Sequence, residues 1–195
     1  VTAASLSDLT TTDNGPIKLV AGGTITINDG DADGLGVDAD GSGDVLLRAA
    51  TDIVVNTDVQ SDTDHINLRA GDDIALNTGA DIRTGGAGTI YLLASNNTAD
   101  AISGIDMAAG TTITTANQNI RLVADNEGDI RLGLVDAGTG DVSLLAEGSI
   151  LDSDASSALN VRADALLMIA DASLTNASNT AGAIGDGDAS NALDD

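Results

Sequence analysis

The stretch "VLLRAATDIVVNTDVQSDTDHINLRAGDDIAL" (residues 45–76) carries the pattern that decides the fold. An apolar-x-apolar-x-Ala block opens it at residues 45–49 and returns at residues 66–70. A second short apolar run starts eight residues after the start of each block. Alternation with a period of two is typical of β-strands, whose successive side chains point to opposite faces. The two blocks are therefore predicted to be equivalent strands of successive repeats.

The block recurs along the whole chain. Its seven copies are "IKLVA" (17–21), "VLLRA" (45–49), "INLRA" (66–70), "IYLLA" (90–94), "IRLVA" (120–124), "VSLLA" (142–146) and "LNVRA" (159–163). Their starts are separated by 28, 21, 24, 30, 22 and 17 residues, or about 24 on average. A weaker third apolar position recurs at Val59, Ile82, Ile113 and Leu174. Variable spacing of a constant block means that the turns change length while the strands stay in register.

A repeat of about 24 residues with two or three short strands cannot bury its own apolar face, whereas stacked repeats can. The sequence therefore predicts an all-β fold, a parallel β-solenoid (β-helix) of about seven coils. We expect the solenoid to span residues 17–175, after a lead-in or cap at 1–16 and before a tail or partial coil at 176–195. The first residue of each block is expected in the core, namely Ile17, Val45, Ile66, Ile90, Ile120, Val142 and Leu159.

The amino-acid composition excludes several kinds of binding partner. The 195 residues include 31 acidic and 7 basic residues, a formal net charge of −24. Such a chain repels nucleic acid and anionic membrane surfaces, so neither is an expected partner. No apolar run approaches the roughly 20 residues of a membrane span, so no membrane insertion is expected. The absence of cysteine excludes disulfides and thiolate metal sites.

Three segments resemble a known family. They are "GDDIALNTGADIRTGGAGTIYLLA" (71–94), "DNEGDIRLGLVDAGTGDVSLLAEGSILD" (125–152) and "NTAGAIGDGDASNALDD" (179–195). These phrases are similar to the repeat regions of giant filamentous-haemagglutinin-like bacterial adhesins, and the resemblance covers nearly all of residues 17–195. It implies a right-handed β-helix, secretion, and a stalk or scaffold role at the bacterial cell surface. The chain does not match the secretion cap of that family, so an interior segment is expected.

The most acidic stretch is "NDGDADGLGVDADGSGD" (residues 28–44), which we expect to be an extended turn between strands. Asp29, Asp31, Asp33 and Gly34 follow positions 1, 3, 5 and 6 of an EF-hand-like calcium loop, although Asp40 stands where a Glu is usual. One hypothesis is a Ca²⁺ site whose candidate ligands are Asp29, Asp31, Asp33, Asp38, Asp40 and Asp44. The alternative is that these aspartates only decorate a solvated turn.

Two further features concern the surface. Asp52 and Asp73 precede the second strand of consecutive coils, so they are expected to lie one layer apart, where a shared cation or salt would relieve their repulsion. Outward positions of the first strand form a column of Val20, Arg48, Arg69, Leu93, Val123, Leu145 and Arg162. The apolar run Leu93, Val123 and Leu145, beside Tyr91, is either covered by the insertion 95–104 or marks a lateral contact with another chain.

Nothing in the sequence singles out a catalytic site. His65, the only histidine, has no neighbouring nucleophile, so a structural or solvent-facing role is expected. Many carboxylate pairs exist, but none is distinguished as the facing pair of a glycoside hydrolase. We therefore expect a non-enzymatic extracellular stalk of an adhesin or fibre. A head-to-tail filament subunit is the second hypothesis, because the ends of a solenoid are open strand edges. A carbohydrate-active β-helix enzyme is the third.

Overall fold

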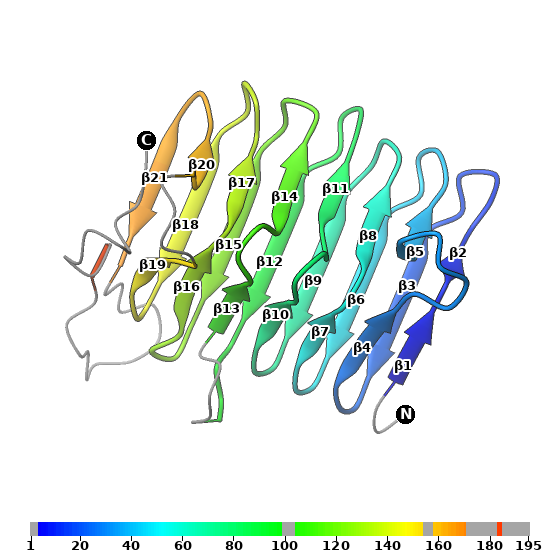
Figure 1. The fold of residues 1–195 in the computed structure, drawn as a ribbon, viewed down its shortest axis with the longest axis horizontal. Coiled ribbons are helices and arrows are strands. Elements are labelled where there is room, and N and C mark those ends of the chain that lie inside the picture. Colours follow the sequence, from blue (N-terminus) through cyan, green and yellow to red (C-terminus); the bar gives the residue numbers. More distant parts are fainter. Residues whose placement is uncertain (1–3, 99–103, 154–157, 171–182, 185–195) are drawn as a thin grey trace.

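Three parallel sheets wrap around one core in the computed structural model, which describes residues 4–98, 104–153, 158–170 and 183–184. Each coil contributes one strand to each of three seven-stranded sheets, called here sheets A, B and C (Figure 1). Every pairing between the strands is parallel, and the described residues contain no helix. The predicted parallel β-solenoid is therefore confirmed, with about six turns of roughly 24 residues.

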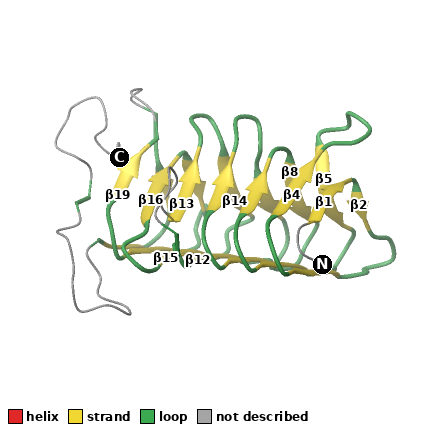
Figure 2. Ribbon diagram, turned by 90° about the horizontal axis from the view of Figure 1, so that it is seen from below, coloured by secondary structure: helices red, strands yellow, loops and turns green. Residues whose placement is uncertain are grey.

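The chain visits sheets C, A and B in that order in each coil. Sheet A contains β1 (Ala4–Ser7), β4 (Ile25–Asn28), β7 (Ile53–Val55), β10 (Ile74–Leu76), β13 (Gly104–Met107), β16 (Asp129–Leu132) and β19 (Ile150–Asp152). Sheet B contains β2 (Leu9–Thr10), β5 (Leu35–Ala39), β8 (Asp58–Ser61), β11 (Ile82–Thr84), β14 (Thr112–Thr115), β17 (Leu134–Asp136) and β20 (Val161–Arg162). Sheet C contains β3 (Ile17–Ala21), β6 (Val45–Ala49), β9 (Ile66–Ala70), β12 (Ile90–Ala94), β15 (Ile120–Ala124), β18 (Val142–Ala146) and β21 (Leu166–Ile169). Figure 2 shows sheet C edge-on along one side of the core.

Inward side chains stack in register from coil to coil. In sheet C the first residue of each block pairs with its counterpart in the next coil, as Ile66 does with Ile90 and Ile90 with Ile120. Leucines in the middle of the blocks and alanines at their ends form two more buried columns. Because each layer repeats the same aliphatic residues, the core needs no aromatic side chain to fill it.

The seventh copy of the block, residues 159–163, is an error of the sequence prediction. Its strand β20 pairs with β17 in sheet B, and β21 takes the seventh place in sheet C. Leu159 is consequently 40% exposed and does not belong to the core. Arg162 likewise lies outside the outward column of sheet C. Strands of sheets B and C share the same alternation, so the pattern alone does not distinguish the two sheets.

The interpretation of residues 28–44 as one extended turn is also wrong. The stretch contains β5, which pairs with β8 and has a register shift between Leu35 and Val37. Val37 and Ala39 are buried in the core. "LGVDA" therefore follows the same apolar-x-apolar-x-Ala pattern as the blocks of sheet C, and two shorter turns flank it.

Both ends of the described chain continue the solenoid. Segment 1–16, expected as a lead-in, contributes β1 and β2, which pair with β4 and β5. At the other end Ile184 forms an isolated parallel bridge with Ile150, and so adds to sheet A beyond β19. The predicted third-strand position at Leu174 lies outside the described residues.

Candidate functional site

The six predicted calcium ligands fall in three places. The turn from β4 to β5 holds Asp29, Asp31 and Asp33, whose carboxylates lie within 4.8 Å of one another and of the Asp8 carboxylate. Asp38 lies on β5. Asp40 and Asp44 lie in the following turn, and Asp44 groups with Asp64 and His65. The structure thus brings three of the six together and adds Asp8, which occupies the corresponding turn one coil earlier.

The carboxylates of this exposed cluster also hold its own backbone in shape. Asp29 accepts hydrogen bonds from the backbone N–H of Ala32 at 2.6 Å and of Gly34 at 3.0 Å. Asp33 accepts one from Leu35 at 2.8 Å. Such bonds from aspartate to nearby backbone N–H groups are typical of turns. The acidic residues of this turn therefore have a structural role whether or not a cation binds.

A second role for polar side chains, most of them acidic, repeats from coil to coil between Asp44 and Ser149 and was missed at the sequence level. We define the strand-entry residue as the one immediately before the first buried apolar residue of a strand. Its side chain accepts a hydrogen bond from the backbone N–H of the strand-entry residue in the next coil. The observed pairs are Asp58 with Asp81 (2.9 Å), Asp81 with Thr112 (2.7 Å), Asp73 with Gly104 (2.7 Å), Asp129 with Ser149 (2.6 Å), Asn119 with Asp141 (2.9 Å), Asp44 with His65 (3.2 Å) and His65 with Thr89 (3.0 Å).

This strand-entry ladder completes the backbone hydrogen bonding at the corners. The carbonyl of a strand-entry residue already accepts a bond from the preceding coil, as the carbonyl of Asp81 does from Val59. Its N–H group lies just before the regular strand pairing begins. A side chain of the preceding coil, and not a backbone carbonyl, accepts its hydrogen bond. Leaving such a donor buried without a partner costs about 1–3 kcal/mol. The sequence signal was the recurrence of Asp directly before a buried Ile or Val.

His65 is one member of this ladder. Its Nδ1 accepts the Thr89 N–H at 3.0 Å and lies 2.9 Å from the Thr89 hydroxyl. Its Nε2 lies 3.2 Å from a carboxylate oxygen of Asp64. An Nδ1 that accepts a hydrogen bond leaves the ring proton on Nε2. Through these contacts His65 links two successive coils, which is a structural role.

Asp52 and Asp73 are brought together as expected, because β7 and β10 pair in register. Asp72 joins them, and the three carboxylates lie within 4.8 Å of one another. Asp72 and Asp73 are buried. Each accepts a backbone hydrogen bond, Asp72 from Thr98 at 2.8 Å and Asp73 from Gly104 at 2.7 Å. Backbone donors therefore stabilise this acidic group.

Asp38 differs from the other candidate ligands, because its environment opposes its charge. Burial raises the pKa of its carboxyl group, and the carboxylates of Asp62 and Asp40 raise it further. Its Oδ1 atom is buried and has no hydrogen-bond partner. Burial and the nearby Glu147 likewise raise the pKa of Asp125. Asp38 is thus a source of instability at neutral pH.

We expect Asp38→Asn to stabilise the protein at pH 7 by about 0.5–1 kcal/mol. A raised pKa means that the folded state binds the proton more tightly than the unfolded chain, so stability falls as the pH rises above 3.8 through the folded-state pKa. Asparagine removes the charge, so part of this pH dependence should disappear. Urea denaturation at pH 4.5 and pH 7 measures both effects.

The matched control is Asp136→Asn, at the equivalent outward position of sheet B. Asp136 lies 3.6 Å from the Arg162 guanidinium and accepts the Gly138 N–H at 2.8 Å. Because these contacts favour the charged Asp136 carboxylate, its replacement by asparagine should not stabilise the protein. Equal stability of Asp38→Asn and the wild type at pH 7 would contradict the account of Asp38.

The predicted apolar stripe of sheet C is not a solvent-exposed surface along its whole length. Leu93 is half-buried, whereas Val123 and Leu145 are only 5% and 9% exposed. The single chain therefore already covers the last two, as the first of the two alternatives, cover from within the chain, requires. Part of the proposed covering insertion, residues 99–103, lies outside the described residues.

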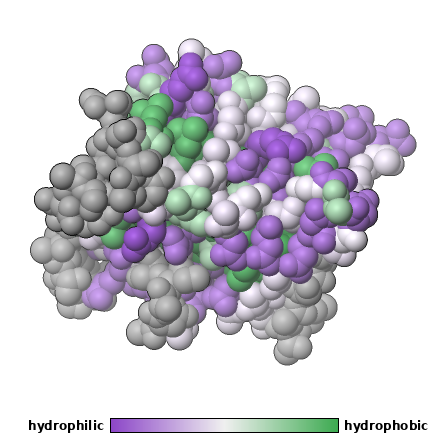
Figure 3. All heavy atoms as spheres, in the orientation of Figure 1, coloured by the Kyte–Doolittle hydropathy of each residue, from purple (hydrophilic) through white to green (hydrophobic). Residues whose placement is uncertain are grey.

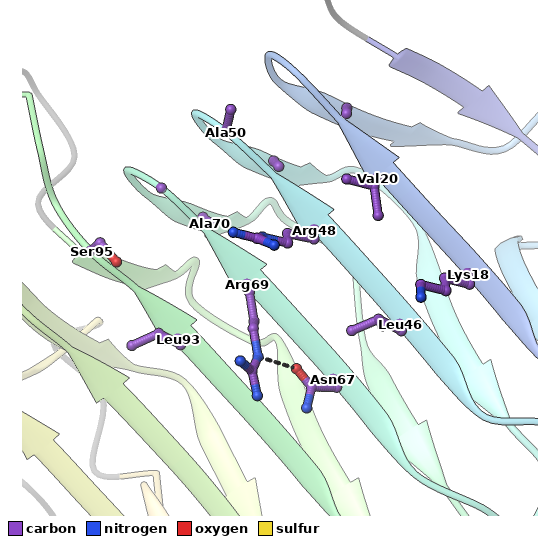
Figure 4. Close-up of a pocket in the computed structure, with 13 residues that line it drawn as sticks. Lys18, Val20, Leu46, Arg48, Ala50, Asn67, Arg69, Ala70, Leu93 and Ser95 are labelled. Carbon is purple, nitrogen blue, oxygen red and sulfur yellow. Dashed lines mark hydrogen bonds between the residues drawn. The ribbon is translucent and has the colours of Figure 1, made fainter. Parts of the chain in front are cut away.

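Three hollows on the surface of the described residues contain at most one carboxylate each. One of them, of about 940 Å³, lies on the outer face of sheet C and is lined by basic, apolar and uncharged polar residues without a carboxylate (Figure 4). Two smaller ones include a single carboxylate each, from Asp44 and Asp62. On the face seen in Figure 3, hydrophilic residues dominate and hydrophobic residues form small separate patches. None of these three hollows has the pair of facing carboxylates that hydrolysis of a glycosidic bond needs.

No protein family, curated protein or solved structure matches the chain. Among the described residues, no helix is long and apolar enough to span a membrane.

Proposed function

We propose that this chain is a non-catalytic, extracellular structural segment of a bacterial surface adhesin or fibre, in which it acts as a rigid β-solenoid stalk. The observation that carries the proposal is the continuity of the scaffold. One aliphatic core runs from Ile17 to Ile150, and three parallel sheets and the strand-entry ladder join successive coils. The likeness of residues 71–94 and 125–152 to filamentous-haemagglutinin-like repeats supports the adhesin assignment and the location at the cell surface.

Small-angle scattering over a wide range of protein concentrations in about 0.5 M salt, which screens contacts between charged surfaces, tests this proposal. A stalk segment should behave as a rod of one chain with a constant cross-section and a constant length. Release of reducing ends from a polysaccharide, lost on substitution of a carboxylate, would overturn the non-catalytic assignment.

We further propose that Ca²⁺ binds at the turn between β4 and β5, through Asp29, Asp31 and Asp33 together with Asp8. Four exposed carboxylates within 4.8 Å supply the oxygen ligands that calcium prefers. A ligand present at ten times its dissociation constant stabilises the folded state by about 1.4 kcal/mol. We therefore expect calcium to raise the thermal midpoint by roughly 3–6 °C over the chelator-treated protein.

Asp31→Asn should remove most of this calcium-dependent increase. Asp106→Asn is the control, because Asp106 pairs with Arg131 at 3.6 Å, away from the cluster. The same midpoint with calcium and with chelator in the wild type would show that the turn binds no calcium.

The second candidate function is a subunit of a head-to-tail filament. Leu166 occupies an inward position of β21, where it pairs with Val142, yet it is 50% exposed. Among the described residues the core is therefore open at Leu166, and a further coil stacked on it would bury the exposed leucine. Scattering distinguishes the two functions, because a filament lengthens with concentration while its cross-section stays constant.

A further inference from the structure

Basic and acidic residues are segregated on this rod. Three of the seven basic side chains pair with carboxylates on sheets A and B: Arg83 with Asp58, Arg131 with Asp106, and Arg162 with Asp136. The other four lie at outward positions of sheet C, namely Lys18, Arg48, Arg69 and Arg121. All four are exposed, and none forms an ion pair with a described residue. The outward positions of the described strands of sheet C include no acidic residue.

The open part of this surface is the hollow that spans β3 to β12, which we call the basic face. It combines Lys18, Arg48 and Arg69 with apolar side chains such as Val20, which is 54% exposed (Figure 4). Two contacts hold the Arg69 side chain in its orientation. Its Nε donates to the Asn67 amide oxygen at 3.0 Å, and its guanidinium lies 5.4 Å from the centre of the Tyr91 ring. The basic face is thus a preformed surface of positive charge on a molecule of net charge −24.

The complementary surface is present on the same molecule. Asp8, Asp29, Asp31 and Asp33 form one exposed cluster of carboxylates, which we call the acidic corner. It lies where the chain passes from sheet A to sheet B. In a solenoid with three sheets, the corner between A and B lies opposite sheet C. The acidic corner and the basic face of one rigid rod therefore cannot touch each other, but they can touch on neighbouring rods.

We propose that the basic face binds the acidic corner of a second copy of this chain, so that rods associate side by side. The two surfaces differ, so the contact is heterologous and leaves one of each free for a further copy. At physiological ionic strength the Debye length is roughly 8 Å, so distant charges are screened while charges in contact still attract. Association should be strongest near this ionic strength. It should weaken in dilute salt through net repulsion and in about 0.5 M salt through loss of the contact.

A charge-swap experiment by sedimentation velocity tests the contact, with chelator present so that calcium plays no part. Arg48→Glu with Arg69→Glu reverses the basic face, and Asp31→Lys with Asp33→Lys reverses the acidic corner. Each double variant alone should self-associate about tenfold more weakly than the wild type. An equimolar mixture should recover association, because the reversed face of one matches the reversed corner of the other. Circular dichroism and thermal midpoints establish that each variant is folded.

Arg131→Glu is the control, since it makes half of that charge change on sheet A and should leave association unchanged. A wild-type chain that stays monomeric at every salt concentration would overturn the proposal, as would a mixture that fails to recover association. A monomeric chain that binds a soluble sulfated polyanion through Arg48 and Arg69 would also overturn it, by assigning the basic face to another anion. The contact does not depend on the stalk function, so its failure would leave that proposal standing.

Discussion

Leu92→Ala should destabilise the protein by about 2–5 kcal/mol, the largest effect we expect from a single substitution. Leu92 is fully buried in β12 and stacks between Leu68 and Leu122 of the adjoining coils. Identical layers above and below hold the backbone at the strand spacing, so the site cannot collapse around the missing atoms. The cost therefore includes a cavity term in addition to the lost transfer free energy.

The neighbouring Leu93→Ala is the matched control, because it removes the same atoms from the outward face of the same strand. Leu93 is half-buried, and its loss should cost about 1 kcal/mol or less. The free energies of unfolding in urea measure both effects. Similar losses of unfolding free energy at the two positions would mean that Leu92 is not tightly packed between the leucines of the adjoining coils.

Asp81→Ala should destabilise the protein by about 1–3 kcal/mol, the second largest effect. The Asp81 carboxylate accepts the Thr112 N–H at 2.7 Å, and its own N–H donates to Asp58 at 2.9 Å. Alanine removes the acceptor and leaves the Thr112 donor without a partner at the corner. Because this N–H group belongs to the next coil, the substitution weakens the junction between two coils.

Asp81→Asn separates the hydrogen bond from the charge, since the amide oxygen can accept the same bond. It should cost well under half as much as Asp81→Ala. Hydrogen exchange gives a local measurement: the Thr112 amide should exchange faster in the alanine variant and little faster in the asparagine variant. Equal losses in the two variants would show that the charge of Asp81 matters and that the bond to Thr112 does not.

The repeat in the sequence was sufficient to predict the architecture, and its errors have a common cause. Six blocks were placed correctly because each forms a strand of sheet C with buried residues at every second position, apart from the half-buried Leu19. "LGVDA" (35–39) carries the same pattern but was taken as part of a turn, because aspartates surround it. "LNVRA" (159–163) carries it too but belongs to sheet B. Alternation identifies a strand, whereas its sheet depends on which neighbour it pairs with.

The acidic residues were harder to interpret from the sequence. An EF-hand-like spacing grouped Asp29, Asp31 and Asp33 correctly. The candidate set also included Asp38, which lies on β5, and Asp40 and Asp44, which lie beyond it. Asp8 was missed, because it reaches the cluster only through the stacking of coils. The strand-entry ladder was missed for the same reason, since its bonds join residues about one coil apart. The signal was available as Asp before Ile or Val at residues 44–45, 58–59, 73–74, 81–82 and 129–130.

The chain is a rigid stack of equivalent coils, and removal of one whole coil is the most direct test of this architecture. Deletion of residues 45–65 removes β6, β7 and β8 and joins Asp44 to Ile66, so that β3, β4 and β5 meet β9, β10 and β11 in register. Small-angle scattering should show a folded rod with an unchanged cross-section, shorter by about 4.8 Å, the spacing of one strand layer. A deletion variant that unfolds, or that changes its cross-section, would contradict the account.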